Sequence, residues 1–169
     1  YGVMHLVAQQ PGAEEDTVIA ALLHDVLEDA PERYSVEAME KDFGRNVVDI
    51  VRMLTKDRSL GSWQERAHAY LMQLEHAPLA VVMIAACDKV HNLSSIVADY
   101  RAVGEKLWER FNSGKKAQLW WYQEVYTVVQ RRLDELNDGQ KIAAKLPIMQ
   151  NYHELLVELD SLSGDTRDE

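Results

Sequence analysis

The fold is decided by residues 18–29, which read VIAALLHDVLED. The first half of this stretch is apolar on every side of a helix, which is typical of a helix in the centre of a fold. Asp16 or Thr17 can cap the helix, and Pro31 follows its end. The sequence therefore predicts a central helix that ends, at or near the interior, in a polar cluster of His24, Asp25, Glu28 and Asp29.

The spacing within this cluster has chemical consequences. Residues four apart share one helical face, so His24 should lie over Glu28 and Asp25 over Asp29. One imidazole and three carboxylates near the interior cost several kcal/mol in desolvation and mutual repulsion. A bound cation would offset that cost. The simpler alternative is an exposed helix end whose acids face water.

A second apolar run ends in the same way. Residues 81–87 read VVMIAAC, and DKVHN follows at 88–92. A carboxylate at the end of a buried run indicates a cation, which makes Asp88 a candidate metal ligand. Asn92 lies four residues on, so its amide should point into the same cavity. Cys87 is expected to be a buried, inert thiol, and His91 is expected on another face of the helix.

The rest of the chain also reads as helical. Apolar stripes and breaks predict further helices at 1–10, 35–43, 46–54, 62–74 and 79–100, two more within 105–137 and one within 152–162. Sustained strand alternation and a glycine-rich phosphate loop are absent from the sequence. The predicted fold class is all-α. At 169 residues the prediction is one domain, 1–162, with a frayed tail at 163–169.

Charge narrows the range of partners. The chain has 18 Lys and Arg against 28 Asp and Glu, a net charge of −10 that repels nucleic acid and anionic membranes. A small phosphorylated nucleotide remains a plausible substrate because a metal can reverse the potential within one pocket. The single cysteine cannot form an intrachain disulfide, and we expect no signal-like start and no apolar run of spanning length. These features favour a soluble, cytoplasmic protein.

Several residues outside the clusters leave alternatives open. Lys56, Arg58 and Lys89 could bind phosphate, or they could be solvated bases. The Trp120 to Tyr122 group is expected to be core or a subunit contact, which leaves a homo-oligomer open.

The quoted strings resemble a known family. AALLHDVLED at 20–29, DKVHNL at 88–93 and the intervening FG, VVDIV and LTK resemble the HD-domain phosphohydrolases, within them the branch that hydrolyses the alarmone (p)ppGpp. The resemblance covers roughly residues 1–100 and implies an HD-domain helical bundle. It implies metal ligands at His24, Asp25 and Asp88, water activation by Glu28 and Asp29, and nucleotide contacts from Asn92 and Ser95. The metal in this branch is usually Mn²⁺, which suits such hard ligands.

The resemblance also implies a reaction. The expected activity is metal-assisted hydrolysis of guanosine-3′,5′-bis(diphosphate) at its 3′ diphosphate, with release of pyrophosphate. One alternative is an HD-type hydrolase of another nucleotide or phosphoester. A second is a non-catalytic, metal-free binding module, although the Glu28 and Asp29 pair would serve no purpose there.

The chain departs from the family pattern at three places. The family has a further metal histidine on its first helix, and His5 is the only histidine before His24. However, His5 lies about 200° around the helix from Val3, away from the inward stripe of Val3, Leu6 and Val7. The expectation is therefore a surface His5, with the family's ligand upstream of Tyr1. Ala85 and Ser94 stand where the branch has basic residues, so alarmone specificity is supported by fewer residues than the phosphohydrolase class.

Overall fold

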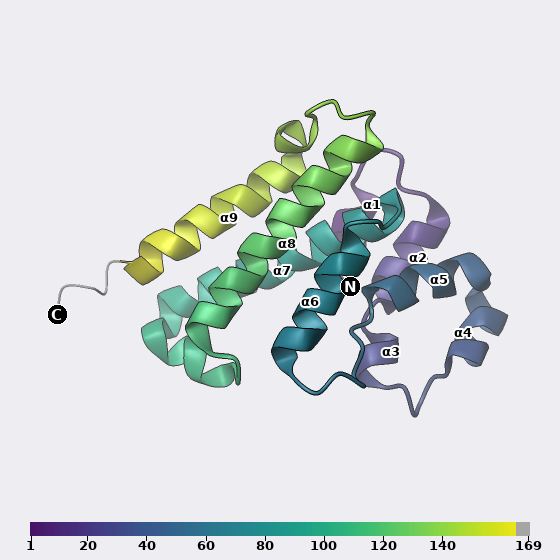
Figure 1. The fold of residues 1–169 in the computed structure, drawn as a ribbon, viewed down its shortest axis with the longest axis horizontal. Helices are drawn as coiled ribbons and strands as arrows, with labels where there is room; N and C mark the ends of the chain where they lie inside the picture. The colour runs from purple at the N-terminus through teal and green to yellow at the C-terminus, as the bar shows by residue number, and fades with distance from the viewer. Residues whose placement is uncertain (165–169) are drawn as a thin grey trace. The chain divides into compact units, whose positions relative to one another are not determined.

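The computed structural model describes residues 1–164, and these form helices, turns and loops without a strand (Figure 1). The all-α prediction is confirmed. The chain divides into two compact units, residues 1–87 and 88–169. The prediction of one domain over 1–162 stays a prediction.

The first unit is a set of short helices built around α2. Helix α2 packs against α1 and α5, and α5 packs in turn against α4 and α6. The buried face of α5 carries Val47, Ile50, Val51 and Leu54, as the apolar spacing predicted. The helices are α1 (Gly2–Ala8), α2 (Glu15–Leu23), α3 (Val26–Asp29), α4 (Val36–Phe43), α5 (Arg45–Leu54), α6 (Trp63–Leu74) and the first part of α7 (Leu79–Val103).

The predicted helix over 18–29 is interrupted, and this corrects the sequence reading. Helix α2 ends at Leu23, and α3 begins only at Val26. The Nδ1 atom of His24 donates to the carbonyl of Ala21 at 2.7 Å, a carbonyl that would accept from the amide of Asp25 if the helix continued. A side chain thus competes with the backbone and ends the helix at the polar cluster.

Burial of α2 is also less complete than predicted. Ala20 and Ala21 are buried, whereas Leu22 is 44% exposed. The helix buries its small-residue face against its neighbours, so an apolar sequence on all sides did not produce burial on all sides.

Helix boundaries in the first unit follow from capping chemistry. The Ser35 side chain accepts from the Ala38 amide at the start of α4. Ser62 and Glu65 form a reciprocal capping box at the start of α6. Gly44, with φ of 87°, ends α4 in a conformation that a side chain would strain. The predicted helices at 35–43 and 62–74 begin at Ser35 and Ser62, and the first of them ends immediately before Gly44.

The second unit is built on two long helices that lie side by side, α8 and α9 (Figure 1). Its elements are the rest of α7, the 3₁₀ helix η1 (Gly104–Arg110), α8 (Gly114–Leu136), the 3₁₀ helix η2 (Ala143–Lys145) and α9 (Pro147–Gly164). The first of the two helices predicted within 105–137 is therefore a 3₁₀ helix. Trp121 and Tyr122 are buried, as expected for core residues.

Helix α9 is longer than predicted at both ends. It begins at Pro147, a residue suited to the first helical position, and buries Ile148 and Met149. It continues to Gly164, and the Ser163 hydroxyl donates to the carbonyl of Leu159 at 2.6 Å. The remaining residues of the predicted tail, 165–169, lie outside the described residues.

Helix α7 carries the second apolar run. Together with η1, it spans Leu79–Arg110 and is long and apolar enough to cross a membrane by length and composition alone. The expectation of no run of spanning length was therefore wrong. Because 61% of its most apolar window is buried within the protein, the helix also fits the core of a soluble fold. Cys87 on this helix is buried, as predicted.

Candidate active site

His24 and Asp25 occupy the turn between α2 and α3. The His24 side chain is 13% exposed, and its Nε2 atom lies 3.0 Å from Oδ2 of Asp25, whose side chain is 62% exposed. A carbonyl oxygen can only accept, so the contact with Ala21 places a proton on Nδ1. Nε2 is then the nitrogen able to bind a metal, and the backbone fixes the ring in that orientation.

The His24 and Asp25 donors fit a hard divalent cation. Two adjacent ligands of an octahedral ion with bonds of about 2.1 Å are separated by about 3.0 Å. The 3.0 Å between Nε2 and the Asp25 oxygen matches that edge. A protonated imidazole paired with the carboxylate would also satisfy this distance.

Glu28 and Asp29 follow on α3, and the loop after α5 contacts both. The backbone amide of Lys56 donates to Oε2 of Glu28 at 3.2 Å. Arg58 approaches Oδ1 of Asp29 at 4.0 Å, between two largely exposed side chains. Figure 1 shows this loop passing beside α3. One Glu28 oxygen is thereby held by the backbone.

Asp88 lies in the second unit, on α7, and its partners correct the sequence argument. Its side chain is 14% exposed and forms an ion pair with the ammonium of Lys89, which is 8% exposed. The Asn92 amide donates to Oδ1 of Asp88 at 3.0 Å, which confirms that these two residues share a helical face. The carboxylate therefore has a cationic partner within the chain, so its burial alone does not require a metal.

Lys89 is a buried base, so the reading of it as a solvated one is wrong. Its Nζ atom lies 5.6 Å from the centre of the Trp121 ring, within cation–π range. Tyr122 is also close enough to respond to these charges. Burial raises the pKa of the Tyr122 phenol, with Lys89 acting in the opposite direction and Asp88 adding to the rise.

Further along α7, Ser94 and Ser95 are exposed. Ser95 donates to the carbonyl of His91 at 3.3 Å, and both side chains face solvent. Ser94 donates to the carbonyl of Val90 at 2.8 Å. Ala85 is fully buried, so a basic residue at this place would require a partner inside the protein.

His5 is exposed, as predicted from the helical phase, whereas Val3 and Val7 are buried. Its ring contacts the side-chain amide of Gln9 at 3.0 Å. Its predicted lack of a metal role remains a prediction.

The predicted ligands fall in both units, with His24 and Asp25 in the first and Asp88 in the second. Within residues 1–164, no group of three or more His, Cys, Asp or Glu side chains is placed to hold a metal ion. Within the first unit, the structure pairs His24 with Asp25 and Glu28 with the Lys56 amide. Within the second unit, it groups Asp88 with Lys89 and Asn92. Sequence reasoning missed the Lys56 amide, because a backbone donor leaves no sequence signal.

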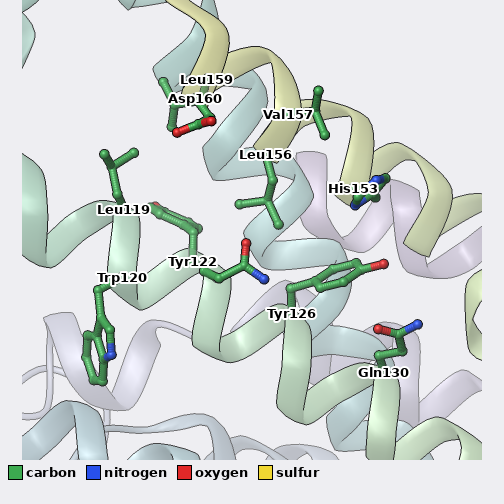
Figure 2. A pocket seen from close by; sticks show the side chains of 11 residues that line it. Leu119, Trp120, Tyr122, Tyr126, Gln130, His153, Leu156, Val157, Leu159 and Asp160 are labelled. Carbon is green, nitrogen blue, oxygen red and sulfur yellow. The ribbon is translucent and has the colours of Figure 1, made fainter. Parts of the chain in front are cut away.

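The second unit also contains a cavity of about 650 Å³ between α8 and α9. In Figure 2, Tyr126 and His153 lie at one end of this cavity and Asp160 at the other. Its walls are mostly apolar, and it contains none of the predicted catalytic residues. Trp120 lines this cavity and is only partly buried.

The fold is shared with solved structures. It matches the crystal structure of lmo0812 from Listeria monocytogenes EGD-e with a TM-score of 0.78 and 24% identity, over 96% of this chain and 97% of that one. It also matches a structure described as a metazoan ortholog of SpoT that hydrolyses ppGpp. This match has a TM-score of 0.68 and 22% identity, over 94% of this chain and 78% of that one. These likenesses define the class of fold, an all-helical bundle.

The family follows from the sequence itself. Residues 1–113 match the HD domain family, and the chain belongs to it. That region contains every predicted metal, catalytic and substrate-binding residue.

Curated relatives carry one activity in their names. The chain is 31% identical over 99 residues to guanosine-3′,5′-bis(diphosphate) 3′-pyrophosphohydrolase MESH1 of Xenopus tropicalis, covering 56% of this chain and 52% of that protein. It is 37% identical over 83 residues to the Drosophila melanogaster protein of the same name, covering 49% and 45%. It is 31% identical over 87 residues to the bifunctional (p)ppGpp synthase/hydrolase SpoT of Escherichia coli, covering 48% and 12%. The chain thus spans about half the length or less of the curated relatives it matches.

Proposed function

We propose that this chain is a metal-dependent phosphohydrolase that removes the 3′ diphosphate of guanosine-3′,5′-bis(diphosphate) as pyrophosphate. The observation that carries the proposal is the geometry of residues 24–29. A ring nitrogen fixed by the backbone faces a carboxylate at 3.0 Å, and a second carboxylate held by the Lys56 amide follows within one turn. Membership in the HD domain family and the names of the curated relatives support the substrate.

His24, Asp25 and Asp88 are the proposed metal ligands, and Mn²⁺ is the proposed ion because one imidazole with carboxylates forms a hard donor set. When bound, such an ion supplies positive charge that polarises the phosphoryl group and makes water more acidic. Asp88 must then exchange its ion pair with Lys89 for the metal, or share its two oxygens between them. The Asn92 amide holds one of these oxygens in place.

Glu28 is the proposed general base. Its Oε2 accepts from the Lys56 amide, which leaves Oε1 to take a proton from the attacking water. The water oxygen bonds to the 3′ phosphorus as the bond from phosphorus to the ribose 3′ oxygen breaks. That oxygen receives a proton, and the products are pyrophosphate and guanosine 5′-diphosphate. Asp29 is proposed to orient the water, with Arg58 beside it.

The proposed substrate-binding residues are Asn92, Ser95, Lys56 and Lys89. Ser95 is exposed and Lys56 partly exposed, so both can reach a ligand, whereas Lys89 would act through its charge on Asp88. The proposed location is the cytoplasm, and neither nucleic acid nor a membrane is a proposed partner. The proposal does not fix the oligomeric state, so a homo-oligomer is compatible with it.

A substrate panel tests this function. Purified full-length protein with Mn²⁺ is expected to convert guanosine-3′,5′-bis(diphosphate) to pyrophosphate and guanosine 5′-diphosphate, and to lose this activity with a chelator. Turnover of a nucleoside monophosphate or a cyclic nucleotide, without turnover of the bis(diphosphate), would move the protein to another branch of HD hydrolases. Repeated absence of bound metal after Mn²⁺ addition would favour a binding module.

A further inference from the structure

The ammonium of Lys89 is buried and contacts two side chains from different helices. The Lys89 side chain is 8% exposed, and its ammonium forms an ion pair with Oδ2 of Asp88. The same Nζ atom lies over the ring of Trp121, 5.6 Å from its centre. Asp88 and Lys89 belong to α7, whereas Trp121 is a buried residue of α8. One charged group therefore contacts a carboxylate of α7 and an aromatic ring of α8.

This placement keeps Lys89 away from solvent. Lysine side chains normally extend their ammonium into water, so a buried ammonium requires a compensating charge. The Asp88 carboxylate supplies that charge, and the negative face of the Trp121 ring adds to the attraction. A substrate contact would draw the ammonium out of both interactions. We therefore expect Lys89 to stay against Trp121 and to act on the site through Asp88.

Both oxygens of Asp88 are engaged by side chains of its own helix. Lys89 contacts Oδ2, and the Asn92 amide donates to Oδ1 at 3.0 Å. A carboxylate oxygen has two lone pairs, so either oxygen can also bind a metal while these contacts persist. The two contacts fix the plane of the carboxylate before a metal arrives, and such support raises the affinity of a metal site.

We propose that Lys89 and Trp121 are positioning residues for the Asp88 carboxylate, an inference that rests on the proposed function because it takes Asp88 as a metal ligand. The ring of Trp121 holds the ammonium of Lys89, and the ammonium holds Oδ2 of Asp88. Helix α8 lies beyond residues 1–113, which match the HD domain family. The positioning pair therefore gives a residue outside the matched region a part in the candidate active site.

The alternative is that Lys89 competes with the metal for Asp88. An ammonium and a divalent cation repel each other when they share one carboxylate. If that repulsion dominated, removing the charge of Lys89 would raise the affinity for the metal. Positioning predicts that the affinity falls, so the sign of one measurement separates the two roles.

Binding of Mn²⁺ to the full chain without substrate is the readout, measured from the electron paramagnetic resonance signal of the free ion. Lys89→Met removes the charge and keeps an unbranched side chain, and Trp121→Leu removes the ring. Trp121→Phe is the conservative variant, because it keeps an aromatic face. The matched control is Trp120→Leu, since Trp120 lines the cavity between α8 and α9. Thermal unfolding without metal shows whether each variant folds.

Lys89→Met and Trp121→Leu are each expected to weaken Mn²⁺ binding about tenfold or more, the usual effect of losing a contact that orients a ligand. Trp121→Phe should retain most of the affinity, and Trp120→Leu should match the wild type. In the Lys89→Met background, Trp121→Leu should have little further effect, because the ring acts through the ammonium. Tighter binding by Lys89→Met, or full additivity of the two losses, would overturn the proposal.

A variant that does not fold is replaced by a milder one. If Lys89→Met does not fold, Lys89→Gln takes its place, because its amide can donate to a carboxylate oxygen but has no charge for the ring to attract. Trp121→Leu should then have little effect in the Lys89→Gln background. A tenfold loss of Mn²⁺ affinity in that background would show that Trp121 does not act through the charge of Lys89, and would overturn the pair.

Hydrolysis separates this inference from the proposed function. If Mn²⁺ affinity depends on Lys89 and Trp121 while the wild type releases no pyrophosphate from the bis(diphosphate), the positioning pair stands and the proposed function fails. If the wild type hydrolyses this substrate and all the variants bind Mn²⁺ equally, the proposed function stands and the positioning pair is rejected.

Discussion

Replacing Glu28 with glutamine separates proton transfer from structure. The Glu28 Oε2 accepts from the Lys56 amide at 3.2 Å, and a glutamine carbonyl oxygen can accept the same hydrogen bond. The side chain should therefore keep its position. Its other terminal atom changes from a carboxylate oxygen that accepts a proton to an NH₂ group that cannot. Folding and metal binding should persist while the reaction slows.

The expected decrease in kcat follows from the proposed role of Glu28 as general base. A positioned general base contributes a factor of about 10² to 10⁴ to the rate. At about 1.4 kcal/mol for each factor of ten, Glu28→Gln should raise the barrier by about 3 to 5 kcal/mol. Because a water in the site can still lose its proton to solvent, we expect kcat to fall about 10²-fold or more rather than to vanish.

The assay measures pyrophosphate release under saturating Mn²⁺, with metal content and thermal unfolding determined on the same preparations. Glu32→Gln is the matched control, because it makes the same chemical change four residues away at an exposed side chain. The control should retain wild-type kcat. An unchanged kcat in Glu28→Gln refutes the assignment of the base and transfers that role to Asp29, to be examined with Asp29→Asn.

The other predictions concern the ligands, the loop after α5 and a helix cap. Asp88→Ala should abolish metal binding and activity together, and a normal metal content in this variant would reject Asp88 as a ligand. His5→Ala should leave metal affinity and activity nearly intact, since His5 is exposed; a metal-free His5→Ala protein would contradict this. Lys56→Pro removes the backbone amide that holds Glu28, and Thr55, at φ −84° and ψ 124°, tolerates a following proline. The kcat of this variant should therefore fall about tenfold below that of Lys56→Ala. Equal kcat values in the two variants would show that the amide has no role. Hydrogen bonds from Ser62 lower the pKa of Glu65 below its ordinary 4.5. Glu65→Gln should therefore reduce the Tm at neutral pH, and the difference in Tm from the wild type should shrink as the pH falls below 4.5. A difference in Tm that does not depend on pH would show that the charge of Glu65 does not stabilise the cap.

The sequence predicted the helices well where local chemistry sets their limits. Ser35, Gly44 and Ser62 mark boundaries through hydrogen bonds or backbone angles within a few residues of themselves. The break at His24 was missed because helical periodicity continues through it, and only the ring's bond to Ala21 reveals the interruption. Periodicity likewise could not distinguish the 3₁₀ turns of η1 from an α-helix.

The candidate site was predictable as a set of residue types but not as a set of contacts. Periodicity placed Asn92 on the face of Asp88, and the structure confirms that pair. The Lys56 amide and Glu28 are 28 residues apart in sequence, so only the folded chain brings them together. The pairing of Asp88 with Lys89 joins neighbours that a helical wheel places on different faces, and the length of the lysine side chain makes it possible.

Anomalous diffraction at the manganese absorption edge, from crystals of the full chain soaked with Mn²⁺, tests the central claim most directly. We predict one strong peak within about 2 to 2.5 Å of Nε2 of His24 and of carboxylate oxygens of Asp25 and Asp88. A peak held by other side chains, or no peak at a Mn²⁺ concentration that supports hydrolysis in solution, would contradict the proposed metal site.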